Sequence, residues 1–328
     1  MKNLLQKLTE TFSPSGYEAA IREVIRAEIE PLADEVHVDA LGNLIARKGK
    51  GGQKIMVAAH MDEIGLIASH IDENGFVRFT TIGGVYPQML MGARVRFYSG
   101  QPGIIYTEPL DKPTDTPAIE KMFIDVGAKS RADCPIKIGQ VAAFERPFLD
   151  LGDRLVAKSM DDRIGCLVAI EALRALRETA NEVYFVFTTQ EEVGTRGAET
   201  SAFGIDPHLG FSLDVTGWGD TPGRKHFDIA LGKGPAIKIK DGGMLSDPRI
   251  IQWMVSAAEK HSIPYQREVL LGGTTDARAM QLVRAGVPVG CISIPCRYVH
   301  SPSEMVDYND VQNAIKLTAA LLSNPVEL

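Results

Sequence analysis

The sequence has few cysteines and lacks a paired cysteine motif. Its 328 residues include four cysteines, and no two of them stand in a Cys-x-x-Cys pair. Cys166 and Cys291 lie in apolar segments, where a cysteine is usually a small core residue. The sequence therefore indicates neither a disulfide framework nor a thiolate zinc site.

A long apolar run and an excess of basic residues are absent as well. No apolar segment approaches the roughly 20 residues that span a bilayer, and residues 1–8 are too polar for the core of a signal peptide. The formal net charge is −7, whereas a nucleic-acid-binding protein usually presents a basic face. We therefore expect a cytoplasmic protein that binds neither membranes nor nucleic acid.

Two kinds of sequence pattern divide the chain. Residues 1–65 and 156–328 alternate between amphipathic helical segments and apolar strand segments, which is typical of a mixed, mostly parallel sheet flanked by helices. Residues 66–155 contain short alternating segments separated by turn signals, and Asn74-Gly75 predicts a hairpin among them. The sequence thus predicts an α/β domain with an inserted small β-barrel domain at residues 66–155.

A histidine and a carboxylate follow the apolar run at residues 55–58. In open α/β sheets, ligands bind beyond the carboxyl ends of the strands. His60 is therefore a candidate metal ligand, and Asp62 is a candidate to orient its imidazole. Taken alone, such a pair is just as typical of surface polar residues, so it gains weight only from the segments that follow.

Two acidic pairs occur farther along the chain. Asp161 and Asp162 precede a predicted helix, where they would either cap the helix or place one carboxylate between two cations. Glu191 and Glu192 follow an apolar strand, so they are either a solvated strand end or a metal ligand beside a general base. Because neighbouring residues on a strand face opposite ways, both glutamates can reach one site only where the strand turns.

Two further strand ends supply one candidate ligand each. Asp214 lies near the end of one apolar strand, a place where an aspartate is otherwise typical of a turn. His300 follows another apolar strand. One carboxylate from each acidic pair completes a set of two histidines and three carboxylates, which suits two Zn²⁺ or Co²⁺ ions, with Mn²⁺ as a further option. With a bridging hydroxide, three carboxylates balance two dications, so the site avoids unpaired buried charge. The candidate ligands are His60, Asp161, Glu192, Asp214 and His300.

These stretches together resemble the M42 family of metallo-aminopeptidases, which includes glutamyl, leucyl and lysyl aminopeptidases and the tetrahedral (TET) enzymes. The resemblance spans essentially the whole chain, with the motifs in family order. A Gly-rich stretch at residues 272–277 is similar to the family's substrate-side loop, but Arg278 stands where a small residue is more usual. Arg278 would contact either an acidic substrate side chain or a surface carboxylate. The matching stretches are Ala59–Gly65, Ala157–Arg163, Glu191–Gly194, Leu213–Val215 and Arg297–Pro302.

The resemblance implies a role for each candidate residue. Asp161 would bridge two metal ions and Glu191 would be the general base acting on a metal-bridging water, while Asp62 would orient His60. The reaction would release the N-terminal residue from peptides with a free N-terminus. The β-rich insert would be a dimerisation domain, and dimers would assemble into a dodecamer. The resemblance implies that His60 and Asp214 complete one metal position, and Glu192 and His300 the other.

Two alternative functions remain at this point. A glycosidase of the endoglucanase kind would use Glu191 with a second carboxylate as acid and nucleophile, although it would not need His60 or His300. A catalytically inactive, metal-binding shell protein would keep the ligands without the reaction. Of the remaining histidines, His208 and His226 lie in polar loops and are interpreted as structural or solvent-facing.

Overall fold

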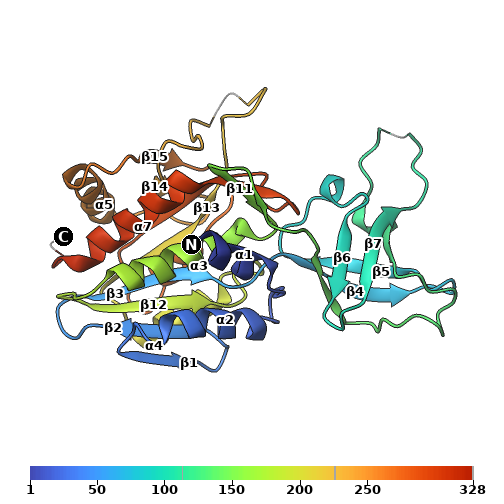
Figure 1. The fold of residues 1–328 in the computed structure, drawn as a ribbon, viewed down its shortest axis with the longest axis horizontal. Coiled ribbons are helices and arrows are strands. Elements are labelled where there is room, and N and C mark those ends of the chain that lie inside the picture. The colour runs from blue at the N-terminus through green and yellow to red at the C-terminus, as the bar shows by residue number, and fades with distance from the viewer. Residues whose placement is uncertain (113, 225–226, 327–328) are drawn as a thin grey trace.

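The chain forms a large α/β unit with a smaller β-barrel at one side (Figure 1). The computed structural model describes residues 1–112, 114–224 and 227–326. The predicted fold class, a mixed α/β sheet flanked by helices with a separate small barrel, is confirmed. None of the helices in the described part of the chain is long and apolar enough to cross a membrane.

The large sheet is mixed, and its centre is parallel. The four central strands run in the same direction, while the strands at both edges pair in antiparallel fashion. The central strands consist mainly of buried apolar residues because helices cover both of their faces. In spatial order the strands are β1 (Glu35–Val38), β2 (Leu44–Lys48), β12 (Glu182–Thr188), β3 (Lys54–His60), β13 (Leu209–Thr216), β16 (Val289–Arg297), β17 (Glu304–Asp307), β11 (Arg154–Ala157) and β10 (Leu149–Asp150), and β14 (Ala236–Lys240) joins β16 to β15 (Gln266–Val269).

Alternate residues of β3 face two separate apolar cores. Val57 belongs to the larger core, whereas Met56 and Ala58 belong to a smaller core on the other face of the sheet. Both faces are therefore closed to water, and the polar residues of the central strands gather where the strands end. The helices of the larger core are α1 (Lys2–Glu10), α2 (Ala19–Ile29), α3 (Met160–Ala175), α5 (Pro248–Lys260) and α7 (Tyr308–Ser323), and those of the smaller core are α4 (Arg196–Ile205) and α6 (Asp276–Gln281).

The barrel contains six antiparallel strands and has its own apolar core. The predicted hairpin at Asn74-Gly75 is confirmed, since it joins two paired strands. β10 and β11 follow the barrel in the chain but pair into the large sheet through β17, so the barrel strands end at Phe144. Around the barrel the strands are β4 (Gly65–Ile71), β5 (Val77–Ile82), β8 (Met122–Asp125), β7 (Pro102–Thr107), β6 (Arg94–Phe97) and β9 (Val141–Phe144), with short 3₁₀ helices at Pro87–Met89 and Ile119–Lys121.

Candidate metal centre

The five candidate ligands meet at the carboxyl ends of the four central parallel strands. His60 is the last residue of β3, Asp214 lies near the end of β13, and Glu192 and His300 follow β12 and β16. Asp161 reaches the same place from the start of α3. Their side chains form two groups in which the ligand atoms lie within 4.8 Å of one another: His60, Asp161 and Asp214, and Asp161, Glu192 and His300.

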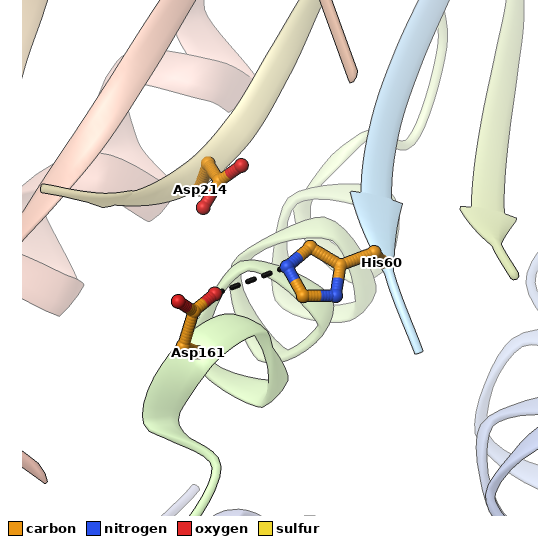
Figure 2. Close-up of side chains that lie close together, drawn as sticks. All are labelled: His60, Asp161 and Asp214. Carbon is orange, nitrogen blue, oxygen red and sulfur yellow. Dashed lines mark hydrogen bonds and ion pairs between the residues drawn. The ribbon is translucent and has the colours of Figure 1, made fainter. Parts of the chain in front are cut away.

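Asp161 is shared by the two groups and presents one oxygen to each. Its Oδ1 lies 3.0 Å from Nε2 of His60, and its Oδ2 lies 3.3 Å from Nε2 of His300. Nε2 of His300 also lies 3.4 Å from Oε2 of Glu192. Figure 2 shows Asp214 facing the same space as His60 and Asp161 from the neighbouring strand β13. The arrangement provides two adjacent positions joined by one carboxylate.

The two members of the first acidic pair have different surroundings. Asp162 accepts hydrogen bonds from the backbone N–H groups of Gly165 and His60, at 3.0 and 3.2 Å, so it caps the helical part of α3. The backbone of Asp161 is not helical, with φ −75° and ψ 107°, and its side chain points toward the two histidines. Asp162 thus caps the helix, and Asp161 has the geometry of a metal ligand.

Asp62 organises the turn that carries the second acidic pair. Its carboxylate accepts hydrogen bonds from the backbone N–H groups of Glu191 at 3.0 Å and Glu192 at 3.2 Å, and from the hydroxyl of Ser15 at 2.6 Å. The same carboxylate lies 3.5 Å from Nδ1 of His60. Asp62 therefore touches the side chain of His60 and fixes the backbone of Glu191 and Glu192 at the end of the adjacent strand.

The side chain of Glu191 enters the centre without occupying either group. Its Oε2 lies 3.9 Å from Nε2 of His60. Burial raises the pKa of Glu191 well above its ordinary value, and the nearby carboxylates of Asp214 and Asp276 act in the same direction. Glu191 is thus a carboxyl group in a buried acidic site, where it favours holding a proton.

The donor set fits a pair of divalent cations. Oε1 of Glu192 is buried and has no hydrogen-bond partner in the described structure, and a bare acceptor of this kind needs a cation or a water. Burial raises the pKa of Glu192 to about 7, and that of Asp214 well above its ordinary value. Without a cation, the site therefore disfavours the charged form of both carboxyl groups. Imidazole and carboxylate together suit Zn²⁺, Co²⁺ and Mn²⁺.

A cavity of about 870 Å³ opens over the centre. One wall comes from the segment after β5 of the barrel, where the backbone packs so closely that a Cβ on Gly84 would lie 2.7 Å from Nδ1 of His300. Thr274 of the Gly-rich segment and Arg278 just after it also line the cavity. Arg278 is exposed. His226 lies outside the described residues.

Comparison with known proteins places this architecture in a family. Residues 42–317 match the family described as M42 glutamyl aminopeptidase. The chain belongs to the M42 peptidase family. A relative of this M42 peptidase is the lysyl aminopeptidase of Pyrococcus furiosus, which is 38% identical over 335 residues, with 97% of this chain and 96% of that one covered.

Two solved structures extend the similarity to three dimensions. Aminopeptidase APDkam598 from Desulfurococcus kamchatkensis has a TM-score of 0.95 and 41% identity, and the match covers 98% of this chain and 94% of that one. The TET1 peptidase of Pyrococcus horikoshii, which can assemble into a tetrahedron or a large octahedral shell, has a TM-score of 0.89 and 35% identity, with 99% of each chain covered. The M42 peptidase thus shares its fold with these proteins over almost its whole length.

Sequence reasoning did not select the carboxylate that holds the backbones of Asp161 and His300. Glu304 is buried at the start of β17 and accepts hydrogen bonds from the backbone N–H groups of Asp161 and His300. It stands four residues after His300 in the printed sequence, but nothing in that spacing distinguishes it from an exposed loop residue. The signal lies in the tertiary contacts alone.

Proposed function

We propose that this M42 peptidase is a two-metal aminopeptidase that releases the N-terminal residue from peptides. The observation that supports this most is the sharing of Asp161 between two groups of potential ligands. His60 and Asp214 would hold one cation with Asp161, and Glu192 and His300 would hold the other. Zn²⁺ or Co²⁺ fits these donors, and Mn²⁺ is a further option.

Glu191 would act as the general base and acid of the reaction. Two bound cations would lower the pKa of a water and polarise the scissile carbonyl. Glu191 accepts a proton from the water as the water oxygen bonds to the carbonyl carbon. Glu191 then delivers that proton to the peptide nitrogen when the C–N bond breaks. The position of Glu191 supports this role, because its Oε2 lies 3.9 Å from Nε2 of His60 while the side chain belongs to neither ligand group. Asp62 keeps the Glu191 backbone in place.

The glycosidase alternative is weakly supported by the same geometry. Glycoside hydrolysis needs two carboxyl groups on opposite sides of a sugar ring. Glu191 and Glu192 instead leave one turn, and they lie beside His60 and His300 of one centre, respectively. A sugar site has no use for His60 and His300 beside a shared carboxylate. An inactive shell protein would not require the Glu191 side chain beside the ligand groups.

A substrate panel tests the proposal directly. The metal-stripped protein, loaded with Zn²⁺, Co²⁺ or Mn²⁺ in turn, would be given aminoacyl p-nitroanilides and their N-acetylated counterparts. We expect hydrolysis of the free-amine substrates alone, its loss on chelation and its return with metal. Hydrolysis of a cellulose substrate by the chelated protein, or no hydrolysis of any aminoacyl substrate, would replace this proposal with one of its alternatives.

We also propose that the barrel joins two copies of the chain and that dimers assemble into a dodecamer. The tetrahedral assembly of the TET1 peptidase from Pyrococcus horikoshii supports this. So does the outer face of β7, where Ile104 and Tyr106 are about half exposed. Light scattering after size-exclusion chromatography would test it. We expect Ile104→Asp to lower the mass of the assembly, and a monomeric wild-type protein would contradict the proposal.

A further inference from the structure

One buried carboxylate connects the backbones of two candidate metal ligands. Glu304 is 1% exposed. Its Oε1 accepts a hydrogen bond from the backbone N–H of His300 at 2.7 Å, and its Oε2 accepts one from the backbone N–H of Asp161 at 2.9 Å. Both oxygens are thus committed to groups that present ligands to the centre.

Neither of these two N–H groups lies in regular structure. His300 has a φ of 63°, a left-handed conformation that costs energy in a residue with a side chain. Asp161 departs from helical geometry just after Ser159, whose φ is 54°. Because the surrounding contacts have to stabilise such conformations, a fixed acceptor at each N–H keeps both ligand backbones in place.

The backbone of Glu304 is itself anchored beside one of these segments. Glu304 stands opposite Ala157 in the pairing of β17 with β11, and β11 leads directly into the segment that carries Asp161. The loop that carries His300 enters β17 from the other side. The carboxylate therefore lies where the two ligand-bearing segments meet, and it gives each N–H group an oxygen of its own.

We infer that Glu304 is a positioning residue that sets the spacing of Asp161 and His300 and thereby the affinity for both cations. The inference rests on the proposed function, because it assigns Glu304 to the ligands of that same centre. Contacts to metal-ligating residues typically contribute about 10–100-fold to metal affinity. Since Asp161 serves both groups, a change at Glu304 affects both positions.

Glu304→Gln and Asp310→Asn form a matched pair for the test. Asp310 is also a buried carboxylate that accepts two backbone N–H groups, from Gly232 at 2.6 Å and Gly234 at 2.7 Å, but it touches no candidate ligand. Zn²⁺ affinity would be measured by calorimetry and chelator competition on the full-length protein, beside thermal unfolding of the metal-free forms. Glu304→Asp keeps two acceptors on a shorter side chain and serves as the milder variant.

We expect Glu304→Gln to weaken binding of both ions by about 10–100-fold, with Glu304→Asp between it and wild type. Activity of Glu304→Gln should recover as Zn²⁺ is raised, whereas Asp310→Asn should bind Zn²⁺ as wild type does, even if its metal-free form unfolds earlier. Wild-type affinity in both Glu304 variants would overturn the inference while leaving the proposed function intact. A wild-type protein that binds no divalent ion would overturn both.

Discussion

The carboxylate of Asp62 accepts a hydrogen bond from the backbone N–H of Glu191 at 3.0 Å, across the ends of two adjacent parallel strands. The same carboxylate accepts from the backbone of Glu192 and lies 3.5 Å from the imidazole of His60. One side chain therefore sets the position of the candidate base relative to both groups of ligands. The pairing of β3 with β12 in register is what makes this contact possible.

Asp62→Asn should slow catalysis more than it weakens metal binding. The amide keeps one acceptor but turns an N–H₂ group toward a backbone N–H, so the turn at Glu191 loses its position. We expect kcat to fall by about 10–100-fold, as is typical for residues that orient metal ligands, with most of the metal retained. Asp72→Asn is a suitable control, because Asp72 accepts two backbone N–H groups in the barrel hairpin. Equal effects of the two changes would remove Asp62 from the catalytic arrangement.

Glu191→Gln should abolish most activity while leaving the ions in place. The amide keeps the shape of the side chain but cannot accept the proton from water, and general-base catalysis typically contributes about 10²–10⁴-fold. The measurements are kcat on a chromogenic aminoacyl substrate and metal content by elemental analysis. Glu199→Gln, on the adjacent helix α4 and away from the ligand groups, controls for loss of charge. A Glu191→Gln protein with normal turnover would assign the base to another residue.

Much of the fold follows from the sequence because the central strands are long and apolar. β3, β12, β13 and β16 are buried on both faces, so each is an apolar run that ends in polar residues. The sequence does not predict β15 and β17, because each strand is only four residues long and contains charged residues. Their charges are matched by tertiary contacts: Glu268 pairs with Lys238 at 3.3 Å.

Part of the candidate site also follows from the sequence, and part does not. His60, Glu192, Asp214 and His300 follow or end apolar strands, and the convergence of parallel strand ends makes their meeting predictable. The choice of Asp161 over Asp162 did not follow from residue patterns alone, because it depends on which carboxylate caps α3. The contacts of Glu304 could not be predicted, since β17 pairs with a strand almost 150 residues earlier in the chain.

The metal-free protein should become less stable as the pH rises. Burial raises the pKa of Glu192 to about 7 and that of Asp276 to about 6. Burial lowers the pKa of His300, but the charges of Glu192 and Asp161 outweigh it and raise the value to about 11. In each case the folded state keeps a proton that the unfolded chain releases, so stability present at low pH is lost as the pH increases.

Calorimetry on metal-free and Zn²⁺-loaded protein, from about pH 5 to about pH 8, would measure this effect. We expect the Tm of the metal-free protein to decrease over this range, whereas bound cations replace the protons and remove most of the decrease. The loaded protein controls for titration elsewhere in the chain. A metal-free Tm that rises over the same interval would contradict the assignment of these buried groups.

Arg278→Ala should change which peptides are cleaved. The side chain of Arg278 lies along the cavity wall beside Gly243, where a Cβ would come within 2.4 Å of its Cδ. Lys238 also lines the cavity, but its charge is balanced by Glu268. Arg278 is exposed on the cavity wall and is therefore a cation available to an acidic group of the substrate.

We expect Arg278→Ala to lower kcat/KM for substrates with N-terminal glutamate by about 2–5-fold relative to those with leucine, as for a solvent-exposed ion pair. Arg278→Lys should retain part of the preference, because it keeps the charge without the planar guanidinium. Tripeptides with free and amidated C-termini distinguish an acidic first side chain from the terminal carboxylate of a short substrate. If all substrates lose activity equally, Arg278 does not contact the substrate's acidic group and its contribution lies in the shape of the Gly-rich segment.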